Sequence, residues 1–258
     1  MTHISKNQVK FVRSLGQKKQ RDLEGLFLSE GEKCTLEMLK RFEPLMIISK
    51  EPIAALAGSE AELLEATDTE IEQMSQLRTP QGVIGVFRRP KSMALPSAED
   101  QLLLALDGVQ DPGNLGTIIR TADWFGITDI VCSRDTADCW NPKVVQATMG
   151  ALARVRVHYT NLFDFIGENR GCSSASMRCT MPVYGTLLDG RNMYEESAIP
   201  QKRNGIIVMG NEGNGISAEV RSLITHPLYI PSYPADRETS ESLNVAIATA
   251  VVLSEFRR

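Results

Sequence analysis

The sequence has little of what builds a covalent or metal-bound scaffold. Its five cysteines are odd in number and include no C-x-x-C pair, and its three histidines lie far apart along the chain. This usage favours reduced thiols in a cytoplasm over a disulfide framework or a thiolate zinc site. No metal site is therefore predicted.

Long apolar runs are also missing. The opening residues, MTHISKNQVK, contain no apolar run after a basic residue, so a secretory signal is not expected, and no stretch approaches a membrane-spanning helix. With 42% apolar and 23% charged residues over 258 positions, the composition is that of a soluble globular protein with one large or two ordinary domains. We expect a cytoplasmic protein without a membrane partner.

The net charge of −4 argues against nonspecific binding of nucleic acid over the whole surface, but the charge is unevenly distributed. All six charged side chains between Met1 and Arg21 are basic. Such an end is either a local phosphate-binding patch or an ordinary solvated helix face, and charge alone does not choose between them. In the first interpretation the RNA-binding residues are Arg13, Lys18, Lys19 and Arg21.

The first third of the chain predicts a small α/β domain over residues 1–90. Strand-like runs at 26–31, 44–50 and 82–90 alternate with helical segments near 7–17, 34–42 and 60–77. Residues 88–98 contain two prolines and few apolar side chains, which is typical of a linker. The second domain is expected at 98–258.

From Gln101 onward, apolar runs of strand length alternate with helix-like segments. This rhythm predicts a mainly parallel sheet covered on both faces, whose ligands bind beyond the carboxyl ends of the strands. Asn141 and Pro142 should begin one of the helices. The last helix, which follows Ser242, should be buried on nearly all sides. The six expected strands are LLLALD, ITDIVCS, ARVRVHY, PVYGTLL, GIIVMG and HPLYI.

Three of the loops that leave these strands are rich in glycine, asparagine or acids: 107–126, 209–217 and 231–244. Familiar phosphate motifs fail in them. A glycine pair in the first loop has P-loop spacing, but Asn114 and Leu115 stand where lysine and a hydroxyl residue are required. The glycines of the second loop run G-x-x-G-x-G, which is the wrong order for a dinucleotide fingerprint. Dense glycine still indicates close approach of the backbone to a ligand, or else plain tight turns.

Together the loops resemble the three motifs of the SpoU (TrmH-type) RNA 2′-O-methyltransferases. The likeness is carried by NLGTIIRTADWFG at 114–126, IVMGNEGNGI at 207–216, and the pair Ile230–Pro231 followed by ESLNVAIATA at 241–250. The N-terminal part resembles a substrate-binding domain related to a ribosomal-protein-like RNA-binding fold. That weaker likeness is carried by Phe27, Leu28, Glu30, Gly31, Thr79, Pro80, Gln81 and Gly82.

The resemblance implies a deep C-terminal trefoil knot, a homodimer, and S-adenosylmethionine bound in the knotted loops. It implies that Arg120 activates the ribose hydroxyl. Because arginine is effectively never deprotonated, we favour a role in which its cation stabilises the developing alkoxide and holds a phosphate. The catalytic residues implied in this way are Asn114, Arg120, Glu212, Ser242 and Asn244, and the cofactor-binding residues are Thr186, Met209, Gly210, Asn211, Ile230 and Leu243.

The leading functional prediction is methyl transfer to a ribose 2′-hydroxyl, with ribosomal RNA favoured by the additional N-terminal domain. The alternatives are a tRNA 2′-O-methyltransferase and a noncatalytic RNA-binding or ribosome-assembly protein on the same fold. The chain departs from the family in the third motif, where residues 232–241 form a longer loop without glycine. We expect this loop to lie at the surface and to become ordered when cofactor binds, like an active-site lid.

Overall fold

The computed structural model describes residues 2–56, 61–91, 93–170, 181–195, 198–199, 204–234, 240 and 242–258. The chain folds into two compact units. The first (unit 1) comprises Met1–Met93 together with Asp138–Arg154, and the second (unit 2) comprises Ala94–Ala137 together with Val155–Arg258. The chain therefore passes between the units at three points in the sequence. Within the described residues, none of the helices has the length and apolar content needed to span a bilayer.

Unit 1 is built on a five-stranded mixed sheet. The central strand β3 pairs in parallel with β4 and antiparallel with β5, and β5 also pairs antiparallel with β2. Across the sheet the strands run β1 (Thr2–His3), β4 (Glu62–Glu65), β3 (Pro44–Ser49), β5 (Val83–Arg88) and β2 (Leu26–Glu30).

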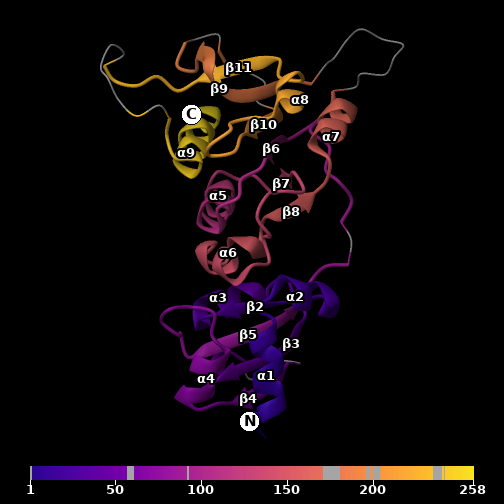
Figure 1. Ribbon diagram of the computed structural model, residues 1–258, viewed down its shortest axis with the longest axis vertical. Coiled ribbons are helices and arrows are strands. Elements are labelled where there is room, and N and C mark those ends of the chain that lie inside the picture. Colours follow the sequence, from indigo (N-terminus) through magenta and orange to yellow (C-terminus); the bar gives the residue numbers. More distant parts are fainter. Residues whose placement is uncertain are drawn as a thin grey trace. The chain divides into compact units, whose positions relative to one another are not determined.

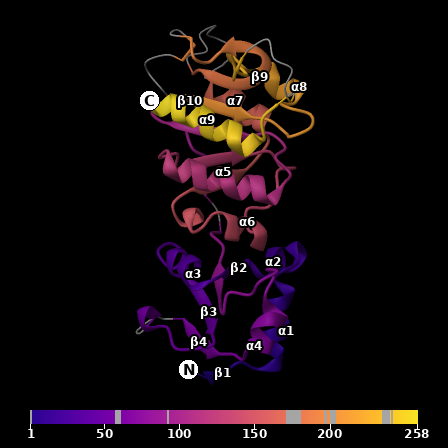
Figure 2. The same ribbon diagram turned by 90° about the vertical axis from the view of Figure 1, so that its left-hand side faces the viewer.

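Helices cover both faces of this sheet (Figure 2). Helices α1 (Lys6–Ser14) and α4 (Asp68–Met74) bury Val9, Val12, Ile71 and Met74 against one face. Each begins at a capping box, in which a hydroxyl residue and a Gln or Glu three positions later satisfy each other's free backbone donors. Helix α3 (Glu32–Met38) lies on the other face, and the short helix α2 (Lys18–Glu24) precedes β2.

The helix predicted at 60–77 is wrong. The structure has strand β4 followed by α4 there, with Thr67 as the N-cap between them. Leu63 and Leu64 belong to clusters on opposite faces of the sheet, as successive residues of a strand must. Leu63 and Leu64 therefore follow the period of a strand. The strand has only four residues, and in so short a segment this period cannot be distinguished from helical spacing.

Residues 138–154 form helix α6 (Pro142–Ala147) and the 3₁₀ helix η2 (Ala151–Ala153). The predicted start of α6 is confirmed, because the Asn141 side chain caps it and Pro142 occupies its first position. Although this segment connects two strands of unit 2, it packs on β2 and α3 of unit 1. The Trp140 ring lies 4.8 Å from the ring of Phe27 and 5.7 Å from that of Phe42. The segment thus completes the aromatic core of unit 1.

Unit 2 contains a six-stranded sheet in which every pair of neighbours is parallel. The six predicted strands and the mainly parallel sheet are confirmed. The strands run in the order β11 (His226–Tyr229), β9 (Val183–Asn192), β10 (Gly205–Met209), β6 (Leu102–Leu106), β7 (Asp129–Cys132) and β8 (Arg156–Tyr159).

Both faces of this sheet are covered (Figure 1). Helices α7 (Leu162–Asn169) and α8 (Ala218–Arg221) pack on one face, where they join a core with Leu103 and Ala105 of β6. Helices α5 (Pro112–Trp124) and α9 (Val245–Arg257) lie side by side on the opposite side of the sheet (Figure 2). This arrangement brings the start of α5 and the start of α9, which lie far apart in sequence, to the same part of the unit.

Helix α9 is less buried than the sequence indicated. Val252 and Leu253 are fully buried, but the side chain of Ile247 is 53% exposed and that of Leu243, which precedes the helix, is 48% exposed. The apolar residues therefore form two faces. One packs inside the chain, and the other is open in a single copy of the protein.

Candidate active site

Two of the three candidate loops, 107–126 and 209–217, are joined at the carboxyl ends of neighbouring strands. Leu106 and Met209 end β6 and β10 in register. The Asp107 backbone N–H, one residue further on, donates to the Met209 carbonyl at 2.9 Å. The Asp107 carboxylate accepts from the Ser217 backbone N–H at 2.7 Å. The first and second loops are therefore held together at the carboxyl-terminal end of the sheet, where ligands of parallel α/β folds bind.

A chain of side-chain hydrogen bonds then links all three loops. The amide nitrogen of Asn114 donates to Oε1 of Glu212 at 2.9 Å. The amide oxygen of Asn114 accepts from Nδ2 of Asn244 at 3.0 Å. These residues lie 98 and 130 positions apart in sequence. Asn114 is thus fixed at both ends of its amide, and three of the five predicted catalytic side chains lie together.

Two helices begin at this chain of bonds. Asp111 caps α5 by accepting from the Asn114 backbone N–H at 2.8 Å, and Pro112 occupies the first turn. Asn244 caps α9 by accepting from the backbone N–H groups of Ala246 and Ile247. Because helix N-termini carry free donors and partial positive charge, the site presents two electropositive helix ends beside a carboxylate.

The second loop is a tight hairpin. Its two bridging residues, Asn211 and Gly215, exchange backbone hydrogen bonds of 2.9 and 3.0 Å. A Cβ atom at Gly210 would come within 2.3 Å of the Gly215 backbone, so glycine is required there by close approach. The Asn211 side chain donates to the Gly108 carbonyl at 2.6 Å and accepts from two N–H groups of its own loop. The Asn211 side chain therefore stabilises the hairpin. Its contact with the cofactor stays a prediction.

The residues predicted to hold the cofactor surround this hairpin. Met209 is buried at the end of β10, and the hydroxyl of half-buried Thr186 on β9 lies 3.5 Å from the Val208 carbonyl. No hydrogen bond among the described residues engages the backbone of Gly210, Ile230 or Leu243. Backbone donors and acceptors of this kind suit the edge of an adenine ring, so the residues present fit S-adenosylmethionine. These assignments also stay predictions.

Arg120 and Ser242 stand outside the hydrogen-bonded chain. Arg120 is exposed on α5, and no hydrogen bond or ion pair within the described residues restrains it. It follows Asn114 by six positions, which places it about 240° further around the helix. Ser242 is exposed just before the α9 cap. The structure therefore leaves the Arg120 guanidinium available to a ligand from outside the chain.

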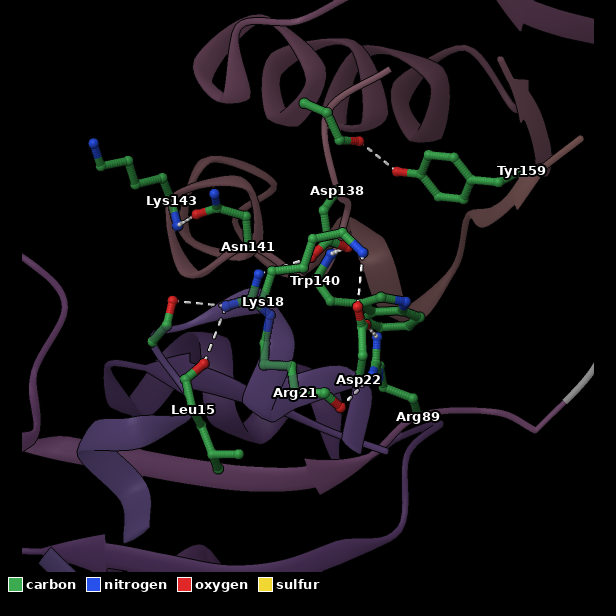
Figure 3. Close-up of polar contacts among 12 residues, drawn as sticks. Leu15, Lys18, Arg21, Asp22, Arg89, Asp138, Trp140, Asn141, Lys143 and Tyr159 are labelled. Atoms are coloured by element: carbon green, nitrogen blue, oxygen red, sulfur yellow. Dashed lines mark hydrogen bonds and ion pairs between the residues drawn. The ribbon is translucent and has the colours of Figure 1, made fainter. Parts of the chain in front are cut away.

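The structure separates the predicted RNA-binding residues of unit 1. Arg13, Lys18 and Lys19 are exposed, and Lys18 pairs with Asp22 at 2.8 Å. The prediction for Arg21 is wrong. Its side chain is 2% exposed, and its guanidinium pairs with Asp138 at 2.7 Å and donates to two backbone carbonyls of the turn before α2 (Figure 3). The charge of Arg21 is used in a buried ion pair and is not accessible to RNA.

Sequence reasoning missed two residues of the site, Asp107 and Asp111. Asp111 stands directly before Pro112, and an Asp–Pro pair is a common start of a helix. Reading that pair would have placed Asn114 in the first turn of α5, where its amide meets the other loops. Asp107 gave a weaker signal, namely a single acid directly after a fully apolar strand.

A second cluster of titratable groups lies at the opposite end of the strands. Burial favours a raised pKa for Asp129, but hydrogen bonds from Arg156, His158 and Thr128 outweigh it and leave the pKa lowered. His158 lies 2.9 Å from this carboxylate and is nearly fully buried. The cluster satisfies its own charges at the amino ends of β7 and β8, so we read it as structural.

Part of the third loop lies outside the described residues. The expectation of a surface lid at residues 232–241 concerns 235–239 and 241, which are not described. The lid therefore stays a prediction.

Comparison with known proteins identifies the chain. Residues 101–254 match the SpoU rRNA Methylase family, and residues 6–85 match an MRM3-like substrate binding domain. The chain is 32% identical over 98% of its length to a Bacillus subtilis protein named 23S rRNA (guanosine(2553)-2'-O)-methyltransferase, of which it covers 97%.

Two solved structures resemble it over the whole length. A putative RNA methyltransferase of the TrmH family from Porphyromonas gingivalis is 41% identical, with a TM-score of 0.85 and 99% of both chains covered. An AdoMet-bound rRNA methyltransferase from Sinorhizobium meliloti is 30% identical, with a TM-score of 0.80, and the match covers 100% of this chain and 96% of that one.

The fold, the site and these relatives define an RNA methyltransferase. The chain belongs to the SpoU rRNA methylase family, whose members are S-adenosylmethionine-dependent RNA 2′-O-methyltransferases. The resemblance seen in the three sequence motifs is confirmed.

Proposed function

We propose that this protein transfers the methyl group of S-adenosylmethionine to a ribose 2′-hydroxyl of ribosomal RNA. The observation that carries the proposal is the bonded chain Glu212–Asn114–Asn244, which joins three distant loops at two helix N-termini. A protein that only binds RNA has no need to fix these polar side chains together. The name of the Bacillus subtilis relative and the substrate-binding match support ribosomal RNA over tRNA.

In this reaction the cofactor supplies an electrophilic methyl group on a sulfonium. The bond from the ribose 2′-oxygen to the methyl carbon forms while the carbon–sulfur bond breaks, and the hydroxyl proton leaves. Arg120 stays protonated, so its role is to stabilise the developing alkoxide and to hold the neighbouring phosphate that takes the proton. Asn114 and Asn244 orient the ribose, with Glu212 fixing the direction of the Asn114 amide. Ser242 would meet the substrate from the approach to α9.

Asn244→Asp tests this arrangement without removing the helix cap. Aspartate caps helices about as well as asparagine, but it cannot donate to Asn114. If the Asn114 amide turned over to donate to the new carboxylate, it would lose Glu212 instead. We expect methyl incorporation into ribosomal RNA to fall by about 10- to 100-fold, as the loss of one or two bonds near charged groups predicts, with little change in thermal stability.

The matched control for this variant is Asn161→Asp, the same change at the N-cap of α7, away from the three loops. It should keep full activity. Full activity in Asn244→Asp would show that the bond between the loops is not part of the reaction.

We further propose that two copies form a dimer through α5 and α9. Trp124 is 84% exposed and Ile247 is 53% exposed, and large apolar side chains left open in this way mark a contact surface. Arg120 and Trp124 are four positions apart, so they share one side of α5. A partner that covers Trp124 would then lie beside Arg120, and each site would be completed at the interface.

Ile247→Asp should convert the dimer to monomers and remove activity, because an unpaired carboxylate cannot be buried in an apolar contact. Leu188→Asp is the control, since Leu188 is 69% exposed on β9 and lies on neither helix. Sedimentation measures the mass of each variant. A dimeric Ile247→Asp protein would place the interface elsewhere. Leu253 does not test it, because that side chain is buried within its own chain.

The trefoil knot in the C-terminal segment and a cytoplasmic location complete the proposal. The family membership supports the knot. The reading of RNA by residues 1–90 and of cofactor by residues 98–258 belongs to the same proposal, and the two family matches support that division.

A further inference from the structure

A polar pocket lies between α1 and α4 of unit 1. Its volume is about 720 Å³, which is in the usual range for small-molecule sites. No apolar side chain of the described residues lines it, so it does not suit a hydrophobic ligand or the apolar face of a partner helix. The lining combines the amides of Gln17, Gln73 and Gln76 with two cations and one carboxylate.

The cations belong to a row on α1. Lys6, Lys10 and Arg13 are spaced i, i+4 and i+7, so they share one side of the helix, while Val9 and Val12 are buried on the other. All three are exposed, α1 contains no acid, and none of the three forms an ion pair within the described residues. Lys10 and Arg13 also line the pocket. Unpaired cations in a row indicate a polyanion as their partner.

The wall opposite α1 is held rigidly. The Gln76 backbone N–H donates to one oxygen of Glu30 at 2.7 Å, and the Ser75 hydroxyl donates to the other at 2.5 Å. Glu30 is 3% exposed on β2; burial raises the pKa of its carboxyl, and these two hydrogen bonds oppose the rise. The Gln76 side-chain nitrogen donates to the Met74 carbonyl at 3.0 Å and to the Arg13 carbonyl at 3.4 Å, which leaves its amide oxygen for a ligand. Gln76 is therefore positioned before any ligand arrives.

Gly16 leaves room for that wall. A Cβ atom at Gly16 would come within 2.2 Å of the Gln76 side-chain oxygen. Any larger residue would have to push this amide out of place. Gly16 therefore lets the end of the Gln76 side chain lie close to the turn after α1, while the buried Glu30 carboxylate holds the Gln76 backbone.

We propose that this pocket binds one unpaired nucleotide of the RNA substrate, with its phosphate on Lys10 and Arg13 and its base edge on Gln73, the amide oxygen of Gln76 and Glu72. The proposal rests on RNA being the substrate. Proteins read RNA sequence mainly from splayed-out bases in single-stranded regions, through hydrogen bonds to their edges. Among the described residues, the lining offers such bonds but no aromatic ring for stacking.

Glu72 gives the pocket a preference among bases. A carboxylate only accepts hydrogen bonds, so it suits the amino groups of adenine, guanine and cytosine and opposes the carbonyl groups of uracil. It also disfavours an acidic peptide as the ligand of the same cations. Within the described part of the chain, no ion pair joins Glu72 to Lys10 or Arg13, although all three line the pocket. Both kinds of charge are therefore available to one bound nucleotide.

The phosphate contact is tested with the full-length protein and fluorescent single-stranded oligoadenylate, oligocytidylate and oligouridylate of equal length. In Lys10→Ala/Arg13→Ala the slope of log affinity against log salt should fall by about 0.7, the contribution of the one phosphate that both cations contact on a single strand. Lys33→Ala/Lys91→Ala removes the same charge from exposed positions of unit 1 outside the pocket and should leave the slope unchanged.

The base contact is tested with Glu72→Gln. Wild type should bind oligoadenylate and oligocytidylate more tightly than oligouridylate, and the variant should lose about tenfold of that preference, the value of one hydrogen bond to a charged group. Its salt slope should not decrease. Glu65→Gln, an exposed acid of β4 outside the pocket, is the matched control and should keep the preference. Gly16→Ala should weaken the preference by displacing Gln76.

Three results would overturn the proposal. The salt slope could be unchanged in Lys10→Ala/Arg13→Ala, or it could fall equally in the control Lys33→Ala/Lys91→Ala. Polyglutamate could also displace the labelled oligonucleotide as well as unlabelled oligoadenylate does. Methyl transfer to ribosomal RNA, measured on the same samples, separates this inference from the proposed function. If the wild-type protein transfers no methyl group but binds the oligonucleotides as expected above, the proposed function is wrong and the proposed nucleotide site stands. If the wild-type protein is active but the pocket variants bind the oligonucleotides as wild type does, the proposed function stands and the proposed nucleotide site is wrong.

Discussion

Arg120→Ala is expected to reduce methyl transfer by about 1,000-fold, the upper range for removing a single group that stabilises charge in a transition state. The side chain is exposed on α5 and forms no hydrogen bond or ion pair with the other described residues, so its loss should not unfold the protein. Cofactor binding should also be nearly unchanged, because Arg120 is not among the residues predicted to hold the cofactor. Labelled methyl incorporation, calorimetry with S-adenosylmethionine and thermal unfolding measure the three properties.

Two further variants sharpen this experiment. Arg120→Lys keeps the charge but loses the planar fork that holds a phosphate at two points, so it should recover only part of the activity. Arg221→Ala removes an exposed arginine on α8 that pairs with Asp189, and it should stay active. Turnover like that of wild type in Arg120→Ala would remove this residue from the mechanism.

The second large effect is expected from removing the N-terminal domain. The position of the linker indicates that residues 98–258 would fold alone, but the contacts of 138–154 indicate otherwise. In that fragment Trp140, α6 and η2 would lose the surface of unit 1 on which they pack, and Asp138 would lose Arg21. We expect aggregation or a melting temperature lower by more than about 10 °C, as several lost core contacts predict.

A fragment in which a glycine–serine linker of equal length replaces residues 138–154 should regain solubility and bind S-adenosylmethionine. In the full-length protein, Arg21→Ala should cost about 3–5 kcal/mol by leaving the Asp138 carboxylate without its ion-pair partner. Arg21→Met/Asp138→Asn removes both charges and keeps an acceptor for the Trp140 backbone N–H, so it should cost less. A soluble, stable fragment 98–258 with its own 138–154 segment intact would contradict this account.

The sequence predicted the parallel sheet well because local chemistry determines it. Strands β6 and β10 are apolar along their whole length and fully buried, as strands covered on both faces must be. The short strand β4 was misread because Leu63 and Leu64 fit either period. The exposure of Ile247 could not be predicted, because an apolar residue on the surface and one in the core have the same sequence pattern.

The candidate site was predictable in membership but not in geometry. The motifs selected Asn114, Glu212 and Asn244, yet nothing local shows that one amide bonds both other residues. Arg21 fails for a related reason. A lysine- and arginine-rich segment predicts an exposed surface, and only the pairing with Asp138, 117 positions away, explains why this one cation is buried.

The order of residues in unit 1 has a consequence for synthesis. The chain is made from its N-terminus, yet the first unit lacks Trp140 and the partner of Arg21 until residues 138–154 have followed. During that interval the ring of Phe27 and a guanidinium of the nascent chain lack their final neighbours. Unit 1 can therefore be completed only after residues 94–137 of unit 2 have been translated.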